Sequence, residues 1–525
     1  MLQESVGTTS APPVPPSAPA RRVVLVGAGL LIGFCVLLRF WTTSGLWLDE
    51  ALSVNIASLS LHQIPDALRR DGAPPLFYVL LHYWIRIFGS SDLAVRSLAG
   101  LFGVVTLPLT WLAARRLGGE RDGSVVAFAA LILIASSPYA VYYDTDARMY
   151  SLVSLLTVLG VLALQGVLRK PSLANLGSLA AVTALLLYTH YWSLYLIGVT
   201  GLWLTWRAVR AGKEGRRAAG SALVAILVGC LVFVPWLPIF LYQLGHTGTP
   251  WAVPANFAAM VNAISSFAGG PTNQGRALAL IYFALLGLGI FGVAKDRRTI
   301  ELDLAARPRA RPLAVILGGT LAAAIVGGYL SHSAFDARYA AVVYLPLILL
   351  AALGISTFLS PLVRAAVLVV AVACGMVSAI PNITSQRTQA TNVAAALGHL
   401  GVAGDVVAYC PDQLGPDTSR LLPTNRYQQI TFPRGNGPQF VDWVDYEQAI
   451  SAADPVNFAA KLEQMAGSIH QIWFVWAPGY QAYGVKCEAI QSQLLTDRSI
   501  AASDQFPLNP SFGEPMELVR FVPLR

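Results

Sequence analysis

The sequence predicts a polytopic α-helical membrane protein with a C-terminal α/β domain outside the membrane. Hydrophobic residues make up 55% of the 525-residue chain and charged residues only 12%, whereas a soluble chain carries roughly 25% charge. The mean hydropathy is +0.57. Apolar runs recur as far as residue 381, and the composition then becomes polar. Because ionised side chains are costly in hydrocarbon, a chain that lies mostly in lipid excludes them.

We expect residues 1–20, which are rich in Pro, Ser and Ala, to be a disordered cytoplasmic N-terminus. Residues 21–381 then form the membrane domain. A span needs about 20 apolar residues, and about eleven windows qualify. These windows cover residues 22–40, 94–115, 124–143, 149–168, 173–189, 191–209, 218–241, 276–294, 312–331, 339–358 and 363–380. The first window lacks a clear small-residue cleavage site, so we interpret it as a retained helix.

One further apolar run, residues 74–89, decides the orientation of the chain. It is short and contains His82 and Arg86, as expected for a helix half-buried at the membrane surface. If it does not span, the basic loops all fall on one side, which is then the cytoplasm. Residues 41–92 become a long outer loop with interfacial helices. The net charge of +8 therefore reflects orientation in the cell (inner or plasma) membrane, and we expect membrane lipids but no nucleic acid as partners.

The C-terminal part, residues 382–525, is predicted to be a small extracytoplasmic α/β domain. Short apolar stretches at 405–410 and 471–476 are typical of buried strands, and residues 457–465 and 487–495 show helical patterns. Cys410 and Cys487 both lie in this part. An oxidising location allows them to pair, but the sequence leaves the pairing open because it does not give their separation.

The strongest chemical signal is the pair Asp49-Glu50, directly after the first span. Two adjacent carboxylates at a membrane boundary are energetically costly. Glycosyl transfer gives a reason for them, because the acceptor hydroxyl must lose its proton and a carboxylate is a suitable base. Acidic residues also stabilise a helix N-terminus, and this alternative stays open for the pair taken alone.

Two more motifs lie on the same face. Residues 71–78 (Asp-Gly-Ala-Pro-Pro-Leu-Phe-Tyr) place two prolines where a loop enters a helix, and a plain helix entry explains them equally well. Asp146, Arg148 and Tyr150 lie where one helix ends and another begins. Arg148 either neutralises Asp146 as a structural pair or binds a phosphate, for which its guanidinium fork is well matched.

A later outer turn carries His190 and Tyr191, and Arg338-Tyr339 enters a late helix from the same side. The aromatic turn also fits an interfacial belt. Snorkelling towards the interface is an ordinary explanation for an arginine such as Arg338.

In this order and on one face, these motifs together resemble the membrane glycosyltransferases with the GT-C fold, and most closely the protein O-mannosyltransferase and aminoarabinose transferase group. The resemblance covers residues 22–360. It rests on the acidic pair, the Pro-Pro-Leu-hydrophobic-Tyr run, the basic turn at 114–118, the acidic-x-Arg-x-Tyr motif, the Tyr-x-His-Tyr turn and the Arg-Tyr pair. Ala73 stands where relatives often have His or Lys, which weakens the expectation of a phosphate contact there. Asp146 stands where relatives often have Glu.

The resemblance implies an inverting glycosyltransferase that moves a mannose- or pentose-type sugar from a polyprenyl-phosphate donor to a cell-envelope glycan, lipid or protein acceptor on the outer face. Asp49 would be the catalytic base, Glu50 would position the acceptor and Asp146 would orient one substrate. Arg148, Arg338 and Tyr339 would bind the donor phosphate, and His190, Tyr150 and Tyr191 the rest of the substrates. No cofactor is expected. A divalent metal stays an open option through Asp49, Asp146 and His190.

Two other functions fit parts of the sequence. A transporter or flippase of lipid-linked sugars predicts polar groups near the bilayer midplane and paired half-repeats, whereas the charges here lie at helix ends. A non-catalytic protein that binds lipid-linked sugar is also compatible with the chain, although the intact Asp49-Glu50 pair favours an enzyme.

Overall fold

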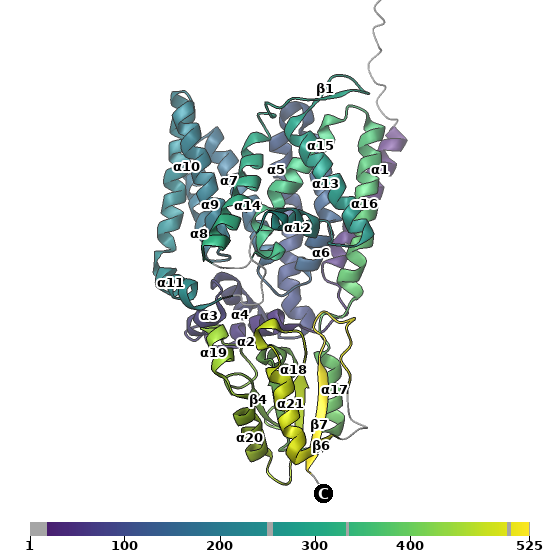
Figure 1. Ribbon diagram of the computed structural model, residues 1–525. Helices are drawn as coiled ribbons and strands as arrows, with labels where there is room; N and C mark the ends of the chain where they lie inside the picture. The colour runs from purple at the N-terminus through teal and green to yellow at the C-terminus, as the bar shows by residue number, and fades with distance from the viewer. Residues whose placement is uncertain (1–17, 249–255, 332–334, 501–505, 524–525) are drawn as a thin grey trace, which may run out of the picture.

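The computed structural model describes residues 18–248, 256–331, 335–500 and 506–523. Within these residues a long helical bundle stands on a smaller sheet domain, with three short helices at the junction (Figure 1). Residues 1–17 of the predicted disordered N-terminus lie outside the described part, and the first helix begins at Ala18.

Apart from α12, the helices of the bundle overlap the predicted windows. In chain order they are α1 (Ala18–Leu38), α5 (Asp92–Ala135), α6 (Pro138–Asp144), α7 (Tyr150–Arg169), α8 (Leu173–Leu187), α9 (Ser193–Arg210), α10 (Lys213–Val232), η1 (Val234–Trp236), α11 (Leu237–His246), α12 (Phe257–Phe267), α13 (Asn273–Phe291), α14 (Arg311–Ser331), η2 (Ala337–Ala340), α15 (Ala341–Thr357) and α16 (Pro361–Thr384). The sequence missed α12, because its 11 residues fall short of the length used to define a span.

Two predicted spans, 94–115 and 124–143, are joined within α5. The chain reverses at Gly119, whose φ of +68° is non-helical, and glycine adopts this conformation without steric cost. The guanidinium of Arg309 also packs where a side chain would stand, since an added Cβ would lie 2.7 Å from its Nη2 atom. The second arm ends at Ala135, and α6 continues towards the junction.

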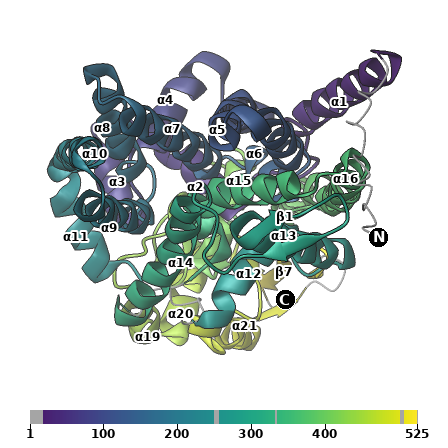
Figure 2. The same cartoon turned by 90° about the horizontal axis from the view of Figure 1, so that it is seen from above.

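Seven helical segments among the described residues are long and apolar enough to cross a membrane. The protein is therefore a multi-pass membrane protein. Helix α15 (Ala341–Thr357) is buried along its whole length and lies at the centre of the bundle, while α1 stands at its edge (Figure 2). The predicted span at α1 is a helix of 21 residues that includes the apolar stretch Leu25–Leu38, and the predicted spans at α8 and α9 are helical but shorter or less apolar than these seven.

The junction consists of α2 (Leu48–Ser58), α3 (Ile64–Asp71) and α4 (Leu76–Phe88). The 13 residues of α4 give a length of about 20 Å, which is less than the roughly 30 Å of a hydrocarbon core. The hairpin of β1 (Gly292–Ala294) and β2 (Ile300–Leu302) lies at the opposite end of the bundle from the sheet domain (Figure 1).

The sheet domain has five strands in the order β4-β3-β5-β7-β6. Strands β3, β4 and β5 are parallel, and β7 runs antiparallel to β5 and β6. The predicted strands are β3 (Val406–Cys410) and β5 (Ile472–Trp476), and the predicted helices are α20 (Pro455–Ala466) and α21 (Lys486–Asp497). The remaining elements are α17 (Ala390–Leu400), η3 (Asp412–Leu414), α18 (Gly415–Arg420), β4 (Gln428–Thr431), α19 (Tyr446–Ala452), η4 (Gln481–Tyr483), β6 (Arg498–Ile500) and β7 (Glu517–Pro523).

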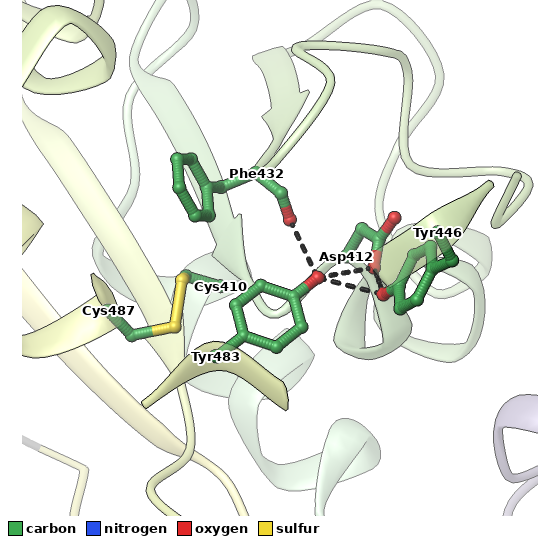
Figure 3. Close-up of a disulfide and its surroundings, with 6 residues drawn as sticks. All are labelled: Cys410, Asp412, Phe432, Tyr446, Tyr483 and Cys487. Carbon is green, nitrogen blue, oxygen red and sulfur yellow. Dashed lines mark hydrogen bonds between the residues drawn. A yellow bond between two sulfur atoms is a disulfide. The ribbon is translucent and has the colours of Figure 1, made fainter. Parts of the chain in front are cut away.

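A disulfide joins Cys410, at the end of β3, to Cys487 in α21 (Figure 3). The pairing that the sequence left open is therefore present. Beside it, Asp412 accepts hydrogen bonds from the hydroxyls of Tyr446 and, at 3.0 Å, Tyr483. Burial raises the pKa of Asp412 to about 7, although the two hydroxyls oppose this shift. The disulfide and this polar group connect the end of β3 and the following residues to α21, α19 and η4.

The sheet domain also fixes the start of α2. Glu514, just before β7, accepts a hydrogen bond from the Leu48 N–H over 3.0 Å. Farther along α2, Asn55 donates to the Gln439 carbonyl over 2.7 Å and accepts from Arg420 over 3.1 Å. The first N–H groups of a helix have no hydrogen-bond acceptor within the helix. Glu514, from a distant part of the chain, supplies the acceptor for the N–H of Leu48.

Candidate active site

The two adjacent acids lie in the first turn of α2, where carboxylates interact favourably with the helix dipole. Their side chains nevertheless meet different surroundings. The Asp49 side chain is 16% exposed and that of Glu50 is 0% exposed. Asp49 alone of the pair is therefore accessible to a substrate.

Glu50 is held by a bidentate ion pair with Arg96. The guanidinium donates over 2.7 Å to Oε1 and over 2.5 Å to Oε2, and the Ala147 N–H donates to Oε1 over 2.9 Å. Burial raises the pKa of Glu50, but Arg96, Arg387 and this N–H outweigh that effect and hold the pKa below its ordinary value. Glu50 is thus a buried anion that ties α2 to α5 and to the loop before α7.

Asp49 lies between two arginines at the junction. Arg338 Nη1 donates to Asp49 Oδ2 over 2.8 Å, and Arg148 Nη2 lies 3.8 Å from the same oxygen. Both guanidinium groups keep some exposure, 18% and 12% of their side chains. Arg338 is oriented by Asp336, whose Oδ2 lies 3.3 Å from its Nε. An accessible carboxylate and two accessible cations therefore share one small volume.

Arg148 connects this volume to the 71–78 motif. Its Nη1 lies 3.2 Å from Ser53 Oγ and 3.3 Å from the Tyr78 hydroxyl. Tyr78 in turn donates to Asp71 Oδ2 over 3.0 Å. Burial raises the pKa of Asp71, and Arg148 partly opposes the shift. The residues of this motif that reach the site are therefore its first, Asp71, and its last, Tyr78, rather than its two prolines.

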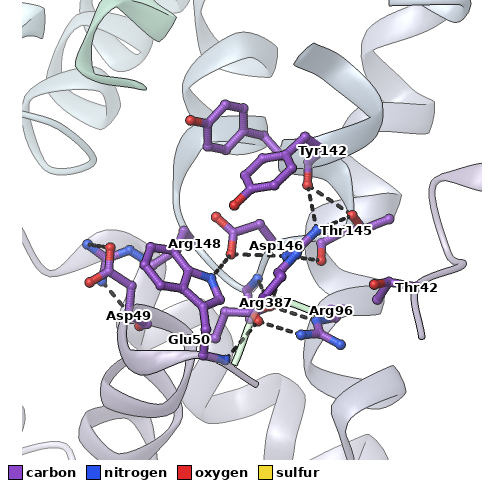
Figure 4. A network of polar contacts seen from close by, with 12 residues as sticks. Thr42, Asp49, Glu50, Arg96, Tyr142, Thr145, Asp146, Arg148 and Arg387 are labelled. Carbon is purple, nitrogen blue, oxygen red and sulfur yellow. Dashed lines mark hydrogen bonds and ion pairs between the residues drawn. The ribbon is translucent and has the colours of Figure 1, made fainter. Parts of the chain in front are cut away.

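Asp146 is buried on the other side of α2 (Figure 4). Its Oδ1 accepts from Trp47 Nε1 over 3.0 Å and lies 3.5 Å from Arg387 Nη1, while its Oδ2 has no hydrogen-bond partner among the described residues. Burial and the nearby Glu50 raise the pKa of Asp146 to about 7. Arg387 follows α16, donates to the Thr145 carbonyl over 2.9 Å and stacks on Tyr142 at 4.4 Å.

Three of the predicted aromatic residues lie against one another. The His190 ring is 5.9 Å from that of Tyr150 and 5.6 Å from that of Tyr339, measured between centroids. Its Nδ1 accepts from the Trp192 N–H over 3.2 Å. Burial, with Arg148 and Arg338 adding to it, lowers the pKa of His190 to about 3, so the ring is neutral near pH 7.

Tyr191 lies elsewhere. Its hydroxyl accepts from Trp236 Nε1 over 3.0 Å and donates to the Gln243 side chain. Gln243 in turn donates to the Leu68 carbonyl over 2.7 Å. Tyr191 therefore connects α9 to α11 and α3, and the structure does not bring it to Asp49.

The possible metal trio does not form. Among the described residues, no group of three or more His, Cys, Asp or Glu side chains is placed to hold a metal ion. Asp49 contacts the two arginines, Asp146 contacts Trp47 and Arg387, and His190 contacts aromatic rings.

Sequence reasoning missed several residues of this network. Arg96 carried a usable signal, because an arginine close to the start of the predicted span 94–115 is costly without a partner. Trp47 lies just before the acidic pair and Tyr78 ends the 71–78 motif, but nothing in their spacing assigned them contacts. Arg387 gave no signal, since it lies 241 residues after Asp146 in a segment assigned to the other domain.

The chain is a polytopic membrane protein with the GT-C fold. ArnT from Cupriavidus metallidurans, solved with bound undecaprenyl phosphate, is similar with a TM-score of 0.58 over 96% of this chain and 98% of that chain, at 14% sequence identity. An oligosaccharyltransferase from Archaeoglobus fulgidus, solved in complex with Zn and sulfate, is similar with a TM-score of 0.50 over 94% of this chain and 73% of that chain, at 10% identity.

Comparison of sequences is less informative than comparison of structures for this chain. An uncharacterized protein from Aquifex aeolicus (strain VF5) is 37% identical over 75 residues, which are 14% of this chain. The match spans 15% of the length of that protein. No protein-family model matches the chain.

Proposed function

We propose that the protein is an inverting glycosyltransferase that moves a sugar from a polyprenyl-phosphate donor to a cell-envelope glycan, lipid or protein acceptor. One observation carries the proposal. Asp49, the accessible acid of the pair, lies at the end of the membrane bundle between Arg338 at 2.8 Å and Arg148 at 3.8 Å. This combines a base for the acceptor with two cations for a phosphate leaving group. The fold shared with ArnT, which was solved with undecaprenyl phosphate, supports a lipid-linked donor.

The proposed reaction is a single displacement. The acceptor hydroxyl oxygen forms a bond to the anomeric carbon of the sugar, and the bond from that carbon to the phosphate oxygen breaks. The hydroxyl proton passes to Asp49. The electron pair of the broken bond stays on the phosphate, whose charge Arg148 and Arg338 stabilise. Attack on the face opposite the phosphate inverts the anomeric configuration.

Glu50 and Asp146 act as positioning residues in this proposal. Both are buried, so in this proposal their side chains do not contact a substrate. Glu50 holds the start of α2 against Arg96, which sets where Asp49 points. Asp146 accepts from Trp47, immediately before α2, and thereby fixes the same turn from the other side. His190, Tyr150 and Tyr339 form an aromatic wall beside the two arginines, which is suited to a sugar face or a prenyl chain.

We place the site and the sheet domain on the extracytoplasmic face. The basic hairpin at 292–302 lies at the other end of the bundle, and cytoplasmic loops carry the excess of Lys and Arg. The disulfide between Cys410 and Cys487 supports the same orientation, because such bonds persist in oxidising compartments. The ionisable network lies at the bundle end, which favours an enzyme over a transporter with a midplane site.

Transfer of radiolabelled sugar tests the proposal. The purified full-length protein is given a panel of polyprenyl-phosphate sugars, including mannose and pentose types, together with a cell-envelope extract. The same sugars as nucleotide conjugates serve as matched control donors. We expect incorporation from at least one lipid-linked sugar and none from the nucleotide conjugates. Tight binding of a lipid-linked sugar without transfer to any acceptor would contradict catalysis and favour a binding protein.

A further inference from the structure

A cavity lies at the junction, away from Asp49. It has a volume of about 790 Å³ and lies between α3, α11 and the segment that leads into α19, which are neighbours at the same edge of the junction (Figure 1). None of its lining residues belongs to the network around Asp49. It is therefore a separate site, and its role does not depend on the proposed transfer reaction.

The lining of the cavity is cationic. Arg69 and Arg70 from α3 and Arg434 from the sheet domain all line it. Among the described residues, none of the three forms an ion pair with a carboxylate. Asp442 is the single acid in the lining, and its Oδ1 accepts from the Val444 N–H over 3.2 Å. Three guanidinium groups thus face one carboxylate, which leaves a positive charge that an anionic ligand would neutralise.

Two of these arginines are held in place. The Arg69 guanidinium lies 3.7 Å from the centroid of the Tyr242 ring, a cation–π contact that orients it. Arg434 donates from Nη2 to the Val444 carbonyl. Arginines that are already oriented lose less conformational freedom when a ligand binds.

The walls of the cavity come from both parts of the molecule and are bonded to each other. The Trp443 N–H donates to the Arg70 carbonyl over 3.1 Å, and the Asp445 N–H donates to the His246 carbonyl over 2.8 Å. Thr247 and Val444 form an isolated β-bridge. The cavity is therefore formed before a ligand arrives.

The outer surface of α11 places this cavity beside lipid. Leu241 and Leu244 are 55% and 61% exposed, and α11 continues the apolar segment Lys213–His246. Tyr242, which lies between these leucines in the chain, lines the cavity. Apolar side chains exposed on one helix, with arginines next to them, are the arrangement expected where a protein meets phospholipid headgroups.

We propose that Arg69, Arg70 and Arg434 form a phosphate-binding site at the membrane surface, distinct from the site around Asp49. The guanidinium fork matches phosphate oxygens in pairs. The phosphate is that of an anionic lipid headgroup or a free phosphate, and the chemistry of recognition is the same for both. Occupation would hold α3 against the sheet domain, because the three arginines come from both.

Binding measurements on the full-length protein in detergent test this site. The probes are fluorescent phosphatidylglycerol, phosphatidylcholine with the same label, and radiolabelled inorganic phosphate. The variant Arg69→Gln/Arg70→Gln/Arg434→Gln is compared with wild type. The matched control Arg86→Gln/Lys213→Gln/Arg276→Gln removes the same charge from exposed side chains elsewhere. Thermal unfolding checks that each variant is folded. If the triple variant is not folded, the three single variants replace it.

We expect phosphatidylglycerol to bind wild type and the control with the same affinity. The triple variant should bind it about 100-fold more weakly than wild type does, and each single variant about fivefold more weakly. This result supports a lipid headgroup as the ligand. Loss of inorganic phosphate binding in the variant, without preference for phosphatidylglycerol over phosphatidylcholine, supports a free phosphate. Equal affinities of wild type, variant and control for every probe overturn the proposal.

Discussion

Arg338 donates a hydrogen bond to Asp49 over 2.8 Å, although 289 residues separate them. The contact joins the start of the buried helix α15, through η2, to the first turn of α2. Glu50, the next residue along α2, faces away from it towards Arg96, because neighbouring side chains on a helix point about 100° apart. One acid of the pair thereby meets the accessible volume, and the other anchors the helix that carries both.

Glu50→Gln tests this division of roles. Removing one partner of a buried ion pair leaves the other charge uncompensated, which costs about 3–5 kcal/mol. We therefore expect the variant to unfold at a clearly lower temperature, measured by thermal unfolding in detergent. Asp66→Asn, at an exposed acid on the neighbouring α3, is the matched control and should unfold as wild type does. Unchanged unfolding of the Glu50 variant would refute its role as an anchor.

Arg338→Lys tests the assignment of the leaving-group cations. Lysine keeps the charge but loses the planar fork that contacts Asp49 and would contact a phosphate. We expect kcat for sugar transfer to fall by about 100-fold, with unchanged stability. Arg276→Lys, at an exposed arginine in α13, should keep full activity. If Arg338→Lys raises KM and leaves kcat unchanged, the guanidinium does not act on the leaving group.

Asp146 makes stability depend on pH. Burial and Glu50 raise the pKa of Asp146 from its ordinary value of 3.8 to about 7. The native state therefore binds more protons than the unfolded state between these values, so this group lowers stability as pH rises from about 4 to about 7. Asp146→Asn removes the effect. We expect the difference in unfolding temperature, variant minus wild type, to increase across this pH range. A difference that does not change with pH would contradict the assignment.

The disulfide is expected to stabilise the sheet domain. It closes a loop of 77 residues, and removing a native disulfide typically costs about 2–5 kcal/mol. Cys410→Ser/Cys487→Ser should lower the unfolding temperature of the oxidised protein, and dithiothreitol should lower that of wild type but not of the double variant. Cys374→Ser, at a free cysteine in α16, serves as control. A wild type that does not respond to dithiothreitol under unfolding conditions would count against this role.

Much of the fold could be predicted, because lipid imposes a simple rule on the sequence. Each predicted span is a helix, since backbone groups in hydrocarbon must be satisfied within the segment. The strands at Val406–Cys410 and Ile472–Trp476 were visible because buried parallel strands are continuous apolar runs. The short helix α12 escaped detection because nothing in 11 residues distinguishes it from a loop with apolar side chains.

The candidate site was harder to predict. Its motifs identified Asp49, Arg148 and Arg338, which the fold brings together. No local pattern showed which of the two acids would be buried, because this depends on where Arg96 packs against Glu50. Tyr191 packs apart from its neighbour His190, which lies at the aromatic wall, because the Tyr191 hydroxyl contacts Gln243 of α11. A substrate-binding role for Tyr191 stays a prediction. Arg387 reaches Asp146 only through the position of the sheet domain.

The most direct test of the proposed mechanism is sugar transfer by the Asp49→Asn variant, measured with the donor that wild type uses. Asparagine keeps the shape of the side chain but cannot accept the hydroxyl proton. We predict a loss of kcat of about 10²–10⁴-fold, with an unfolding temperature and a donor affinity close to those of wild type. Asp66→Asn should transfer at the wild-type rate. Turnover by Asp49→Asn at the wild-type rate would contradict the assignment of Asp49 as the base and, with it, the proposed mechanism.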